Sequence, residues 1–541
     1  MPDPTASKRW TLIAATVGSS IVFLDSTIVP VALPRIGEEL PATFLGTLEG
    51  QSYVYYGYLL SLSALLILAG ALADFYGRRR LFVVGLVGFG ATSALCGLAP
   101  NMETLVVARL LQGAAGAVLV PGSLALITAT FEGPEQGRAF GIWAGASAAT
   151  TIAGPIAGGA LVAYVSWRAA FLVNLPLVVG ALWATVVHVA ESRDQEATGR
   201  FDWWGAFLVA VAVGGLTLGP IRGQAEQWQD PIAYASLVVG AAAAIAFPFA
   251  MRRSSHPLVP LELFRSRNFN VTNVSTLVIY GALYVMGQFT ALFIIGILGY
   301  NEIGYAIATV PASVFLALLS TRFGALADRF GPRLFMTVGP AVMGASLLWL
   351  ARTPADSEPW RFALGNPSSY APPGDFWVDL MPPFAVFGVG LAIMVAPLTT
   401  ALMRSVPVRH SGVASAFNNA VSRVGPQLAG ALLFIAITVS FYAALGDRLP
   451  GQDPAALRQE VSPLNPVPAG TPRAVAGAAI EASTEAFHLA MFASALLCFT
   501  GAAINAWGIR NPAPEPEAPS SKAVVPCPQA PPVETPHSPV G

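Results

Sequence analysis

One five-residue segment occurs twice in this chain, and each copy lies between two long apolar runs. The letters GALAD stand at residues 70–74 and again at residues 324–328, and a glycine with nearby arginines follows each copy. A repeat made of an apolar helix, this segment, a basic turn and another apolar helix indicates two related membrane halves. The fold must therefore place two similar helix pairs in one bilayer.

The apolar runs are numerous enough to indicate a polytopic membrane protein. Hydrophobic residues make up 54% of the chain and charged residues only 11%, whereas a soluble domain carries roughly 25% charged residues. Runs long enough for a membrane helix of about 20 residues are centred near residues 22, 62, 90, 115, 150, 179, 212, 241, 283, 313, 342, 392, 427 and 497. The sequence thus predicts an all-α polytopic fold with about fourteen transmembrane helices in a lipid bilayer.

The spacing of the two GALAD segments predicts the domain organisation. They end the second and the tenth apolar runs, whereas two adjacent six-helix halves would place them six runs apart. The runs near residues 212 and 241 are the surplus, so we expect a helix pair inserted between two six-helix bundles. The predicted parts are a cytoplasmic N-terminal tail (1–10), an N-terminal six-helix bundle (11–190), the inserted helix pair (191–251), a cytoplasmic loop (252–270), a C-terminal six-helix bundle (271–510) and a disordered Pro-rich cytoplasmic tail (511–541).

The arginines predict which side each loop faces. Most loop arginines fall in alternate connections, beginning with residues 78–80, and the short connections between them carry few. Because basic loops stay on the cytoplasmic side, both termini are expected in the cytoplasm and the protein in the cell membrane, from composition that of a bacterium. The first run, residues 11–33, is too long for a signal-peptide core and is expected to be a retained span. The long connections at 351–380 and 445–483 then lie outside.

The chain lacks the residues that several classes of function require. The lysines are Lys8 and Lys522, both in polar tails, so the chain has neither a Walker-type ATP site nor an intramembrane lysine for a Schiff base. Cys96, Cys498 and Cys527 show no paired spacing for a disulfide or a metal. We expect no enzyme activity, no cofactor, no nucleic-acid partner and no obligate protein partner.

Four patterns stand in order along the chain, at residues 24–34 (LDSTIVPVALP), 70–80, 109–113 (RLLQG) and 154–159 (GPIAGG). Together they resemble signatures of the major facilitator superfamily, and in particular of its fourteen-helix drug:proton antiporter branch. Residues 24–34 (LDSTIVPVALP) are similar to the first-helix signature of that branch, and residues 70–80 to the loop signature of the superfamily. Residues 109–113 (RLLQG) resemble its buried-arginine motif, and residues 154–159 (GPIAGG) resemble its antiporter motif.

The chain departs from these signatures at two positions. Pro30 stands where the first-helix signature usually has Asn, which removes a polar side chain and adds a kink. Phe75 stands where the loop signature usually has Arg, and the second copy keeps that residue as Arg329. We therefore expect the stronger charged contact in the C-terminal half.

The resemblance implies a secondary transporter that exports amphipathic small molecules, such as drugs, dyes and antibiotics, by alternating access. The proton gradient would drive it without a cofactor, and its partners would be the bilayer, a small-molecule substrate and protons. A dedicated exporter of a lipid or self-made metabolite and a proton symporter stay open as alternatives. A receptor that transports nothing also stays open, but it leaves Asp25 and the repeated segments without a role.

Asp25 and Arg109 are the predicted proton-coupling residues. A carboxylate inside an apolar helix is costly and often functional. Counted along their spans, Asp25 lies ~12 Å and Arg109 ~9 Å below the outer surface, so the two side chains can meet in the N-terminal bundle. A carboxylate beside a guanidinium can take up and release a proton as its exposure changes. A permanent structural ion pair is the alternative.

The two GALAD turns are predicted to close the inner side of the transporter. Asp74, at the end of its apolar run, can accept hydrogen bonds from N–H groups at the start of a neighbouring helix or from an arginine in the other half. The preference of basic loops for the cytoplasmic side explains the arginine cluster, but it does not explain Asp74. The predicted gating residues are Gly70, Asp74, Gly77, Arg78, Gly324, Asp328, Arg329, Gly331 and Arg333.

Small residues in the span near residue 150 are predicted to form a seal. Gly154, Gly158 and Gly159 share one helix face, and Pro155 removes a helical hydrogen bond. Close packing with a kink suits a seam between two moving halves, and the resemblance implies that this seam blocks proton leak on the outer side. Ordinary close helix packing is the alternative.

Aromatic and amide side chains in several spans can line a substrate cavity for lipophilic cations or neutral drugs. The candidates are Gln112, Tyr280, Tyr284, Gln288, Phe289, Met394, Asn418 and Arg423. Aromatic residues near span ends also occur in interfacial belts. Arg423, ~18 Å into its span, either faces the cavity or pairs inside the bundle.

Overall fold

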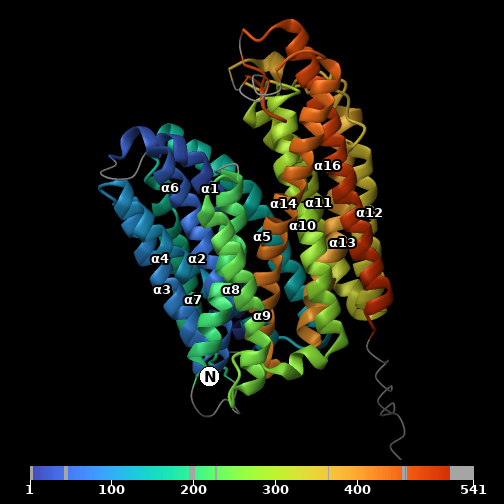
Figure 1. The fold of residues 1–541 in the computed structure, drawn as a ribbon. Helices are drawn as coiled ribbons and strands as arrows, with labels where there is room; N and C mark the ends of the chain where they lie inside the picture. The colour runs from blue at the N-terminus through green and yellow to red at the C-terminus, as the bar shows by residue number, and fades with distance from the viewer. Residues whose placement is uncertain are drawn as a thin grey trace, which may run out of the picture. The chain divides into compact units, whose positions relative to one another are not determined.

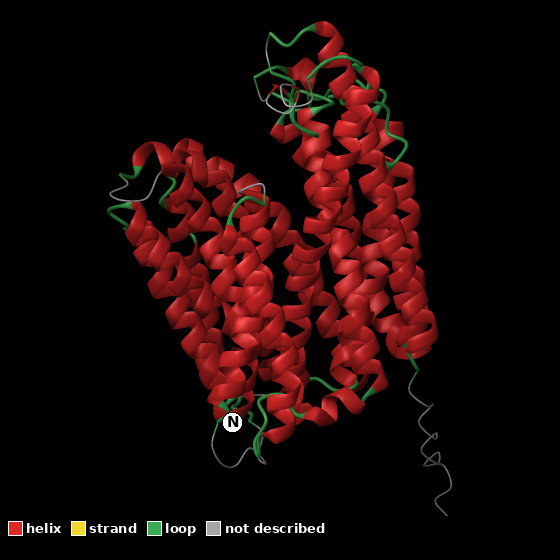
Figure 2. Cartoon of the chain, in the orientation of Figure 1, coloured by secondary structure: helices red, strands yellow, loops and turns green. Residues whose placement is uncertain are grey.

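The structure, a computed structural model, describes residues 4–41, 47–193, 201–225, 228–363, 365–453, 457, 460–468 and 470–511. These residues form α-helices, a few short 3-10 and π segments and the loops between them, with no strand among them (Figure 2). The predicted all-α class is confirmed. Residues 1–510 make up one compact unit. The predicted disordered tail, apart from Asn511, lies outside the described residues.

Long helices occur at the fourteen positions that the apolar runs predict. The first seven elements are α1 (Pro4–Glu39), α2 (Thr47–Tyr76), α3 (Arg78–Gly97), α4 (Met102–Thr130), α5 (Gly133–Tyr164), the short α6 (Ala169–Leu172) and α7 (Asn174–His188). The next are α8 (Trp203–Ala225), α9 (Pro231–Arg253), α10 (Arg267–Gly296), α11 (Glu302–Phe330), α12 (Pro332–Leu350), α13 (Met381–Arg404), α14 (Ser411–Arg448) and α16 (Arg473–Gly508).

Length and composition allow most of these helices to cross a membrane. Within the described residues, thirteen segments are long and apolar enough, and α6 and α7 together make one of them, Ala169–His188. α5 is not among the thirteen, but its 32 residues are long enough to span. Its many glycines, alanines and threonines make it less apolar than its neighbours. With α5 included, the spans agree with the predicted number.

Two large hydrophobic cores are centred on the two predicted bundles. One core contains buried side chains of α1–α5 and α7, such as Phe82 and Phe89, and extends to buried residues of α8, α9, α10, α13 and α14. The other lies among α10–α14 and α16, where Phe293 stacks on Phe487 with ring centroids 4.0 Å apart. Figure 1 shows the two groups of helices. α8 and α9 pack on each other, and α8 also contacts α2 and α14, one helix from each group. The exact boundaries of the parts stay predictions, although α1 already begins at Pro4, inside the predicted tail.

A glycine in the left-handed region ends each GALAD helix. Gly77 separates α2 from α3 with φ 115°, and Gly331 separates α11 from α12 with φ 83°. Residues with a Cβ rarely adopt such a backbone, so glycine is the residue that permits this sharp reversal. Pro332, the first residue of α12, suits the start of the next helix because its fixed φ is helical. The sequence repeat is therefore also a repeat of backbone conformation.

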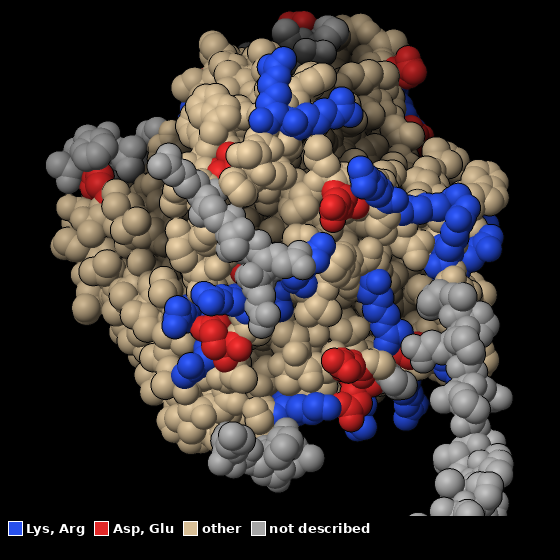
Figure 3. Space-filling view, turned by 90° about the horizontal axis from the view of Figure 1, so that it is seen from below, with Lys and Arg blue, Asp and Glu red and all other residues tan. Residues whose placement is uncertain are grey.

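Both turns lie at the same end of the helices, which we call the motif end. The beginnings of α5 and α14 lie there as well, in contact with Asp328 and Asp74 respectively. Lys8 near the start of α1 forms an ion pair with Glu135 of α5 at the same end. Figure 3 views this face and shows its many arginines interspersed with acidic side chains. The described residues of the long connections 351–380 and 449–472 lie at the opposite end (Figure 2).

Candidate functional site

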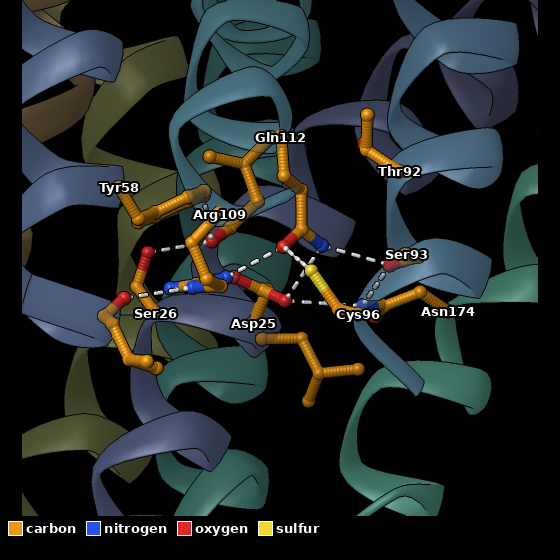
Figure 4. Close-up of polar contacts among 12 residues, drawn as sticks. Asp25, Ser26, Tyr58, Thr92, Ser93, Cys96, Arg109, Gln112 and Asn174 are labelled. Carbon is orange, nitrogen blue, oxygen red and sulfur yellow. Dashed lines mark hydrogen bonds and ion pairs between the residues drawn. The ribbon is translucent and has the colours of Figure 1, made fainter. Parts of the chain in front are cut away.

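Asp25 and Arg109 form an ion pair inside the N-terminal bundle (Figure 4). Arg109 Nη1 lies 2.6 Å from Asp25 Oδ2, and both side chains are 0% exposed. Asp25 comes from the middle of α1 and Arg109 from the second turn of α4, so the depth argument from the sequence brings the correct pair together. Its role in proton coupling stays a prediction.

Three further polar side chains surround the Asp25 carboxylate. Gln112 Nε2 and Asn174 Nδ2 both donate to Asp25 Oδ1, at 3.0 and 3.2 Å. The same two amides donate to the Ser93 hydroxyl. Gln112 is also the acceptor of a 2.7 Å hydrogen bond from Arg109. The site is thus a buried network of α1, α3, α4 and α7 rather than an isolated pair (Figure 4).

Sequence reasoning missed part of this network. Gln112 was expected in the substrate cavity, but it is fully buried against Asp25, because it lies one helical turn after Arg109 on the same face of α4. Ser93 and Asn174 were not singled out. Asn174 could have been found, since an amide within an apolar run needs a hydrogen-bond partner there.

Arg109 has partners other than Asp25. Its Nε donates to the Val54 carbonyl at 3.0 Å, and its guanidinium carbon lies 4.0 Å from the centroid of the Tyr58 ring. Its Nη2 has no hydrogen-bond partner among the described residues. The guanidinium therefore keeps several interactions that do not depend on the charge of Asp25.

The predicted seal glycines pack within the N-terminal bundle. A Cβ on Gly154 would collide with Thr27 of α1, and one on Gly158 would lie 3.3 Å from Ile28. The side chain of Pro155 and the surroundings of Gly159 lie outside the described features. The seam between the halves uses other glycines of α5. Gly141 and Gly145 approach Thr321 and Ala317 of α11 so closely that a Cβ would lie 2.5 and 3.1 Å from their backbone.

Asp74 holds the first motif turn against the start of α14. Its carboxylate accepts hydrogen bonds from the backbone N–H groups of Gly412, at 3.2 Å, and Val413, at 2.9 Å. Arg78 donates to the same carboxylate at 2.9 Å and also to the Val408 carbonyl. Asp74 and Arg78 are both buried. The arrangement matches the expected contact with a helix start, where the helix dipole favours an anion.

Asp328 occupies the equivalent place in the second motif turn. Its carboxylate lies against Gly137 in the N-terminal part of α5 and forms an ion pair of 2.9 Å with Arg404 of α13. Arg404 also donates to the carbonyl of Gly133, so it joins α13 to the other bundle. The expected partner Arg329 is instead exposed and lies over the Phe330 ring.

The remaining gating candidates are two glycines and an arginine, and they do not lie in the same part of the molecule. Gly70 meets Gly412 and Ala416 of α14, and Gly324 meets Gly137 of α5, each with no room for a Cβ. These two glycines therefore allow close backbone contact between the halves. The guanidinium of Arg333 donates to the Ala506 carbonyl of α16, within its own bundle.

A cavity of about 620 Å³ lies between the two helix groups. Its lining combines aromatic, amide and aliphatic side chains of α2, α5, α8, α10, α11, α13 and α14: Tyr55, Tyr56, Leu59, Thr151, Ile221, Leu283, Tyr284, Val285, Gly287, Gln288, Ser313, Leu316, Leu391, Pro426 and Gln427. The volume is in the range of small-molecule binding sites. Of the predicted cavity residues, Tyr284 and Gln288 line it.

Other predicted cavity residues lie elsewhere. Phe289 and Met394 are buried in the C-terminal core, because they face the inside of the bundle rather than the space between bundles. Tyr280 is half-buried and packs against the same core. Asn418 donates to Asn273 and Thr276 and so joins α14 to α10. Arg423 is not itself a lining residue but lies one turn before Gln427, which is, and it is half-buried without an ion pair in the described part of the chain.

Comparison with family models identifies this architecture. The model of the Major Facilitator Superfamily matches residues 15–430. The chain belongs to this superfamily. It is therefore a membrane transporter by family, and the resemblance seen in the four sequence segments is confirmed.

Relatives of this transporter carry names of resistance and export proteins. The chain is 33% identical over 424 residues to the tetracenomycin C resistance and export protein of Streptomyces glaucescens, covering 78% of this chain and 74% of that protein. It is 32% identical to the multidrug resistance protein Stp of Mycobacterium tuberculosis, covering 86% and 83%. It is 32% identical to the puromycin resistance protein pur8 of Streptomyces alboniger, covering 84% and 86%.

A solved structure supports the fold independently. The crystal structure of the human organic anion transporter MFSD10 covers 93% of this chain and all of its own length, with a TM-score of 0.57. The two sequences are 11% identical, so the likeness concerns the arrangement of the helices. The transporter thus shares its helix arrangement with a protein of very different sequence.

Proposed function

We propose that this transporter exports small amphipathic molecules, including antibiotics, in exchange for protons and by alternating access. It would lie in the cell membrane with its motif end in the cytoplasm, as the arginine-rich loops of that end favour. The names of its relatives support drug export. The proton-coupling step rests on the buried site around Asp25.

The observation that carries this proposal is the set of alternative partners around the Asp25–Arg109 pair. If Asp25 takes up a proton and loses its charge, Arg109 keeps its bonds to Gln112 and the Val54 carbonyl and its place over Tyr58. Breaking a buried ion pair normally leaves an uncompensated charge and costs about 3–5 kcal/mol. The remaining partners reduce that cost, as a site that must switch between two protonation states requires.

The packing of α5 offers a route from the proton site to the seam between the halves. Gly154 of α5 contacts Thr27, two residues beyond Asp25 on α1. Toward the motif end, Gly141 and Gly145 of the same helix contact α11 in the other half. A small movement of α1 upon protonation would therefore reach α11 through one rigid helix, and α11 carries Asp328.

Transport by inverted membrane vesicles tests the proposal. A panel of one cationic, one uncharged and one anionic fluorescent dye is offered with and without an imposed pH gradient, acidic inside. We expect the gradient to drive uptake of at least one dye by the natural protein. Asp25→Asn, which keeps the shape of the side chain, should lose the gradient-driven component while dye binding persists.

Asp230→Asn is a matched control. Asp230 also pairs with an arginine, Arg222, but lies outside the spans, so uptake should change less than about twofold. Gradient-driven uptake by Asp25→Asn at the natural rate would overturn the role of Asp25. Uptake of no dye by the natural protein under any gradient would overturn drug export itself.

Dedicated export of a single antibiotic is a second candidate, because two of the relatives are named after single compounds. Deletion of the gene in its host separates the two functions. Loss of resistance to many unrelated dyes and drugs indicates multidrug export, whereas sensitivity to one compound alone indicates a dedicated exporter.

A further inference from the structure

We propose that the cavity between the bundles selects aromatic molecules carrying one ionised acidic group, such as a carboxylate or sulfonate, and that Arg423 binds this group. The proposal rests on the proposed export function and specifies its substrate class. It differs from the sequence-based expectation of lipophilic cations or neutral drugs. Four observations carry it: the depth of Arg423, the absence of an acidic partner for it among the described residues, the aromatic wall beside it and the composition of the cavity lining.

Arg423 lies deep in the bilayer region of α14. Counted from Ser411, it is ~18 Å into the helix, too deep for its side chain to reach the headgroup layer easily. The residue is half-buried, and no hydrogen bond or ion pair engages it within the described residues. Gln427, one helical turn further along α14, lines the cavity between the bundles. Arg423 therefore lies on the side of α14 that faces this cavity.

Three buried carboxylates of the described helices already have other arginine partners. Asp25 pairs with Arg109, Asp74 with Arg78 and Asp328 with Arg404. Each of these pairs is electrically neutral, so the charge of Arg423 adds to the interface as an excess positive charge. An isolated charge at this depth is costly. A negatively charged ligand would offset that cost.

The cavity beside Arg423 suits the rest of such a ligand. Gln427 and Pro426, which line the cavity, follow Arg423 by one turn of α14, so these residues share a helix face. Tyr55 and Tyr56 form an aromatic wall, with ring centroids 5.2 Å apart. The described lining of this cavity contains no Asp or Glu. The lining therefore offers a cation the faces of its tyrosine rings and its amide oxygens, but no carboxylate in its described part.

The chemistry of Arg423 and of the cavity lining together determines the class of ligand. A guanidinium presents a planar fork of N–H donors that matches a carboxylate or sulfonate. Tyrosine rings stack on planar aromatic systems, and the amides of Gln288 and Gln427 can bond peripheral oxygens. A planar aromatic anion satisfies all of these groups together. A cation of the same shape satisfies the rings and the amides but not the guanidinium.

Two dyes with one ring system test this inference. 8-Anilinonaphthalene-1-sulfonate carries a permanent negative charge, and N-phenyl-1-naphthylamine is its uncharged counterpart. Binding to the purified full-length protein in lipid nanodiscs is measured by fluorescence, with empty nanodiscs subtracted, and gradient-driven uptake is measured in inverted vesicles. We expect the sulfonate to bind more tightly and to be exported faster than the naphthylamine.

Substitution of Arg423 gives the specific readout. Arg423→Gln should weaken sulfonate binding by about tenfold to a hundredfold, the effect of one hydrogen-bonded charge, and should abolish the preference over the naphthylamine. Arg423→Lys should restore part of the preference. Arg322→Gln is the matched control, because it removes the same charge from an exposed position of α11, and the preference should persist.

The outcomes separate this inference from the proposed export function. Equal binding of the two dyes by the natural protein, or an equal loss of both in Arg423→Gln, would overturn the anion preference while leaving export intact. Gradient-driven export of a cationic dye in preference to the sulfonate would overturn it as well. Absence of gradient-driven uptake of either dye, with the sulfonate still bound through Arg423, would instead overturn the proposed function.

Discussion

The two GALAD turns have the same sequence and the same backbone reversal, but their aspartates are held in different ways. At the first turn, Asp74 accepts two backbone N–H groups of α14 and an arginine from its own turn, Arg78. At the second, Asp328 lies against α5 and pairs with Arg404, which comes from α13. The side chain of Arg78 is 2% exposed and that of Arg404 is 34% exposed.

This difference shows that a repeated motif preserves the position of the carboxylate rather than its partner. Both aspartates lie at the beginning of a helix from the opposite bundle. The first turn lacks the basic residue that usually follows the aspartate, with Phe75 in its place, and Arg78 supplies the charge. The second turn keeps that residue as Arg329, yet the charge comes from α13. The first contact is the more buried and has more hydrogen bonds, so the stronger contact is in the N-terminal half, opposite to the expectation from the sequence.

Removal of the two aspartates should give the largest contrast. We expect Asp74→Ala to destabilise the closed arrangement of the motif end by about 3–5 kcal/mol, because it leaves a buried arginine unpaired. Asp328→Ala should cost about 1–2 kcal/mol, because water can solvate the half-exposed Arg404. Hydrogen exchange at Gly412 and Val413 should accelerate by at least about a hundredfold in the first variant. Acceleration in the α5 segment 133–141 should be about tenfold in the second. Equal effects would contradict the asymmetry.

Substitution of the two glycines that precede the aspartates should instead give equal effects. A Cβ on Gly70 would lie 2.5 Å from Gly412 O, and one on Gly324 would lie 2.6 Å from Gly137 O. Overpacking of this kind costs about 1–3 kcal/mol, so Gly70→Ala and Gly324→Ala should lower the melting temperature of the purified protein similarly. Gly180→Ala is the control, because no atom lies within 4 Å of its added Cβ, and it should not lower the melting temperature. A destabilising effect at one turn alone would show that the backbone approach is not shared.

The two arginines that lie at the second turn, Arg404 of α13 and Arg329 of α11, should differ in their effects. Arg404→Gln removes the partner of Asp328, whose side chain is 3% exposed, and a bond to Gly133, so we expect a loss of about 3 kcal/mol. Arg329→Gln removes an exposed charge and should change stability by less than about 0.5 kcal/mol. Thermal unfolding and transport rate measure both. A larger effect of Arg329→Gln would support the gating role that the sequence pattern predicts for this residue.

The sequence was informative where an interaction depends on depth along a helix. Asp25 and Arg109 could be paired because the rise per residue is fixed, so position in a span gives depth in the membrane. The same count could not tell which way a side chain faces. Gln112 and Met394 lie at plausible depths for a cavity, but Gln112 faces the ion pair and Met394 faces the C-terminal core.

The substrate cavity was the least predictable site for the same reason. Tyr284 and Gln288 are one turn apart on α10 and both line the cavity, whereas Phe289, the next residue, is buried on the other side of that helix. A shift of one residue turns a helical side chain by about 100°. An apolar sequence in a membrane does not reveal that rotation, because both the lipid-facing and the buried sides are apolar.

The sequence by itself determined the spans, the two related halves and the sharp glycine turns between paired helices. These features depend on local properties, namely the length of apolar runs and the backbone freedom of glycine. The tertiary structure decided which charges meet, because their partners are far apart in the chain: Asp74 bonds Gly412, 338 positions away, and Asp328 pairs with Arg404 rather than with Arg329 beside it. Such pairing depends on how each helix is rotated and which neighbour it packs against, and only the assembled bundle sets both.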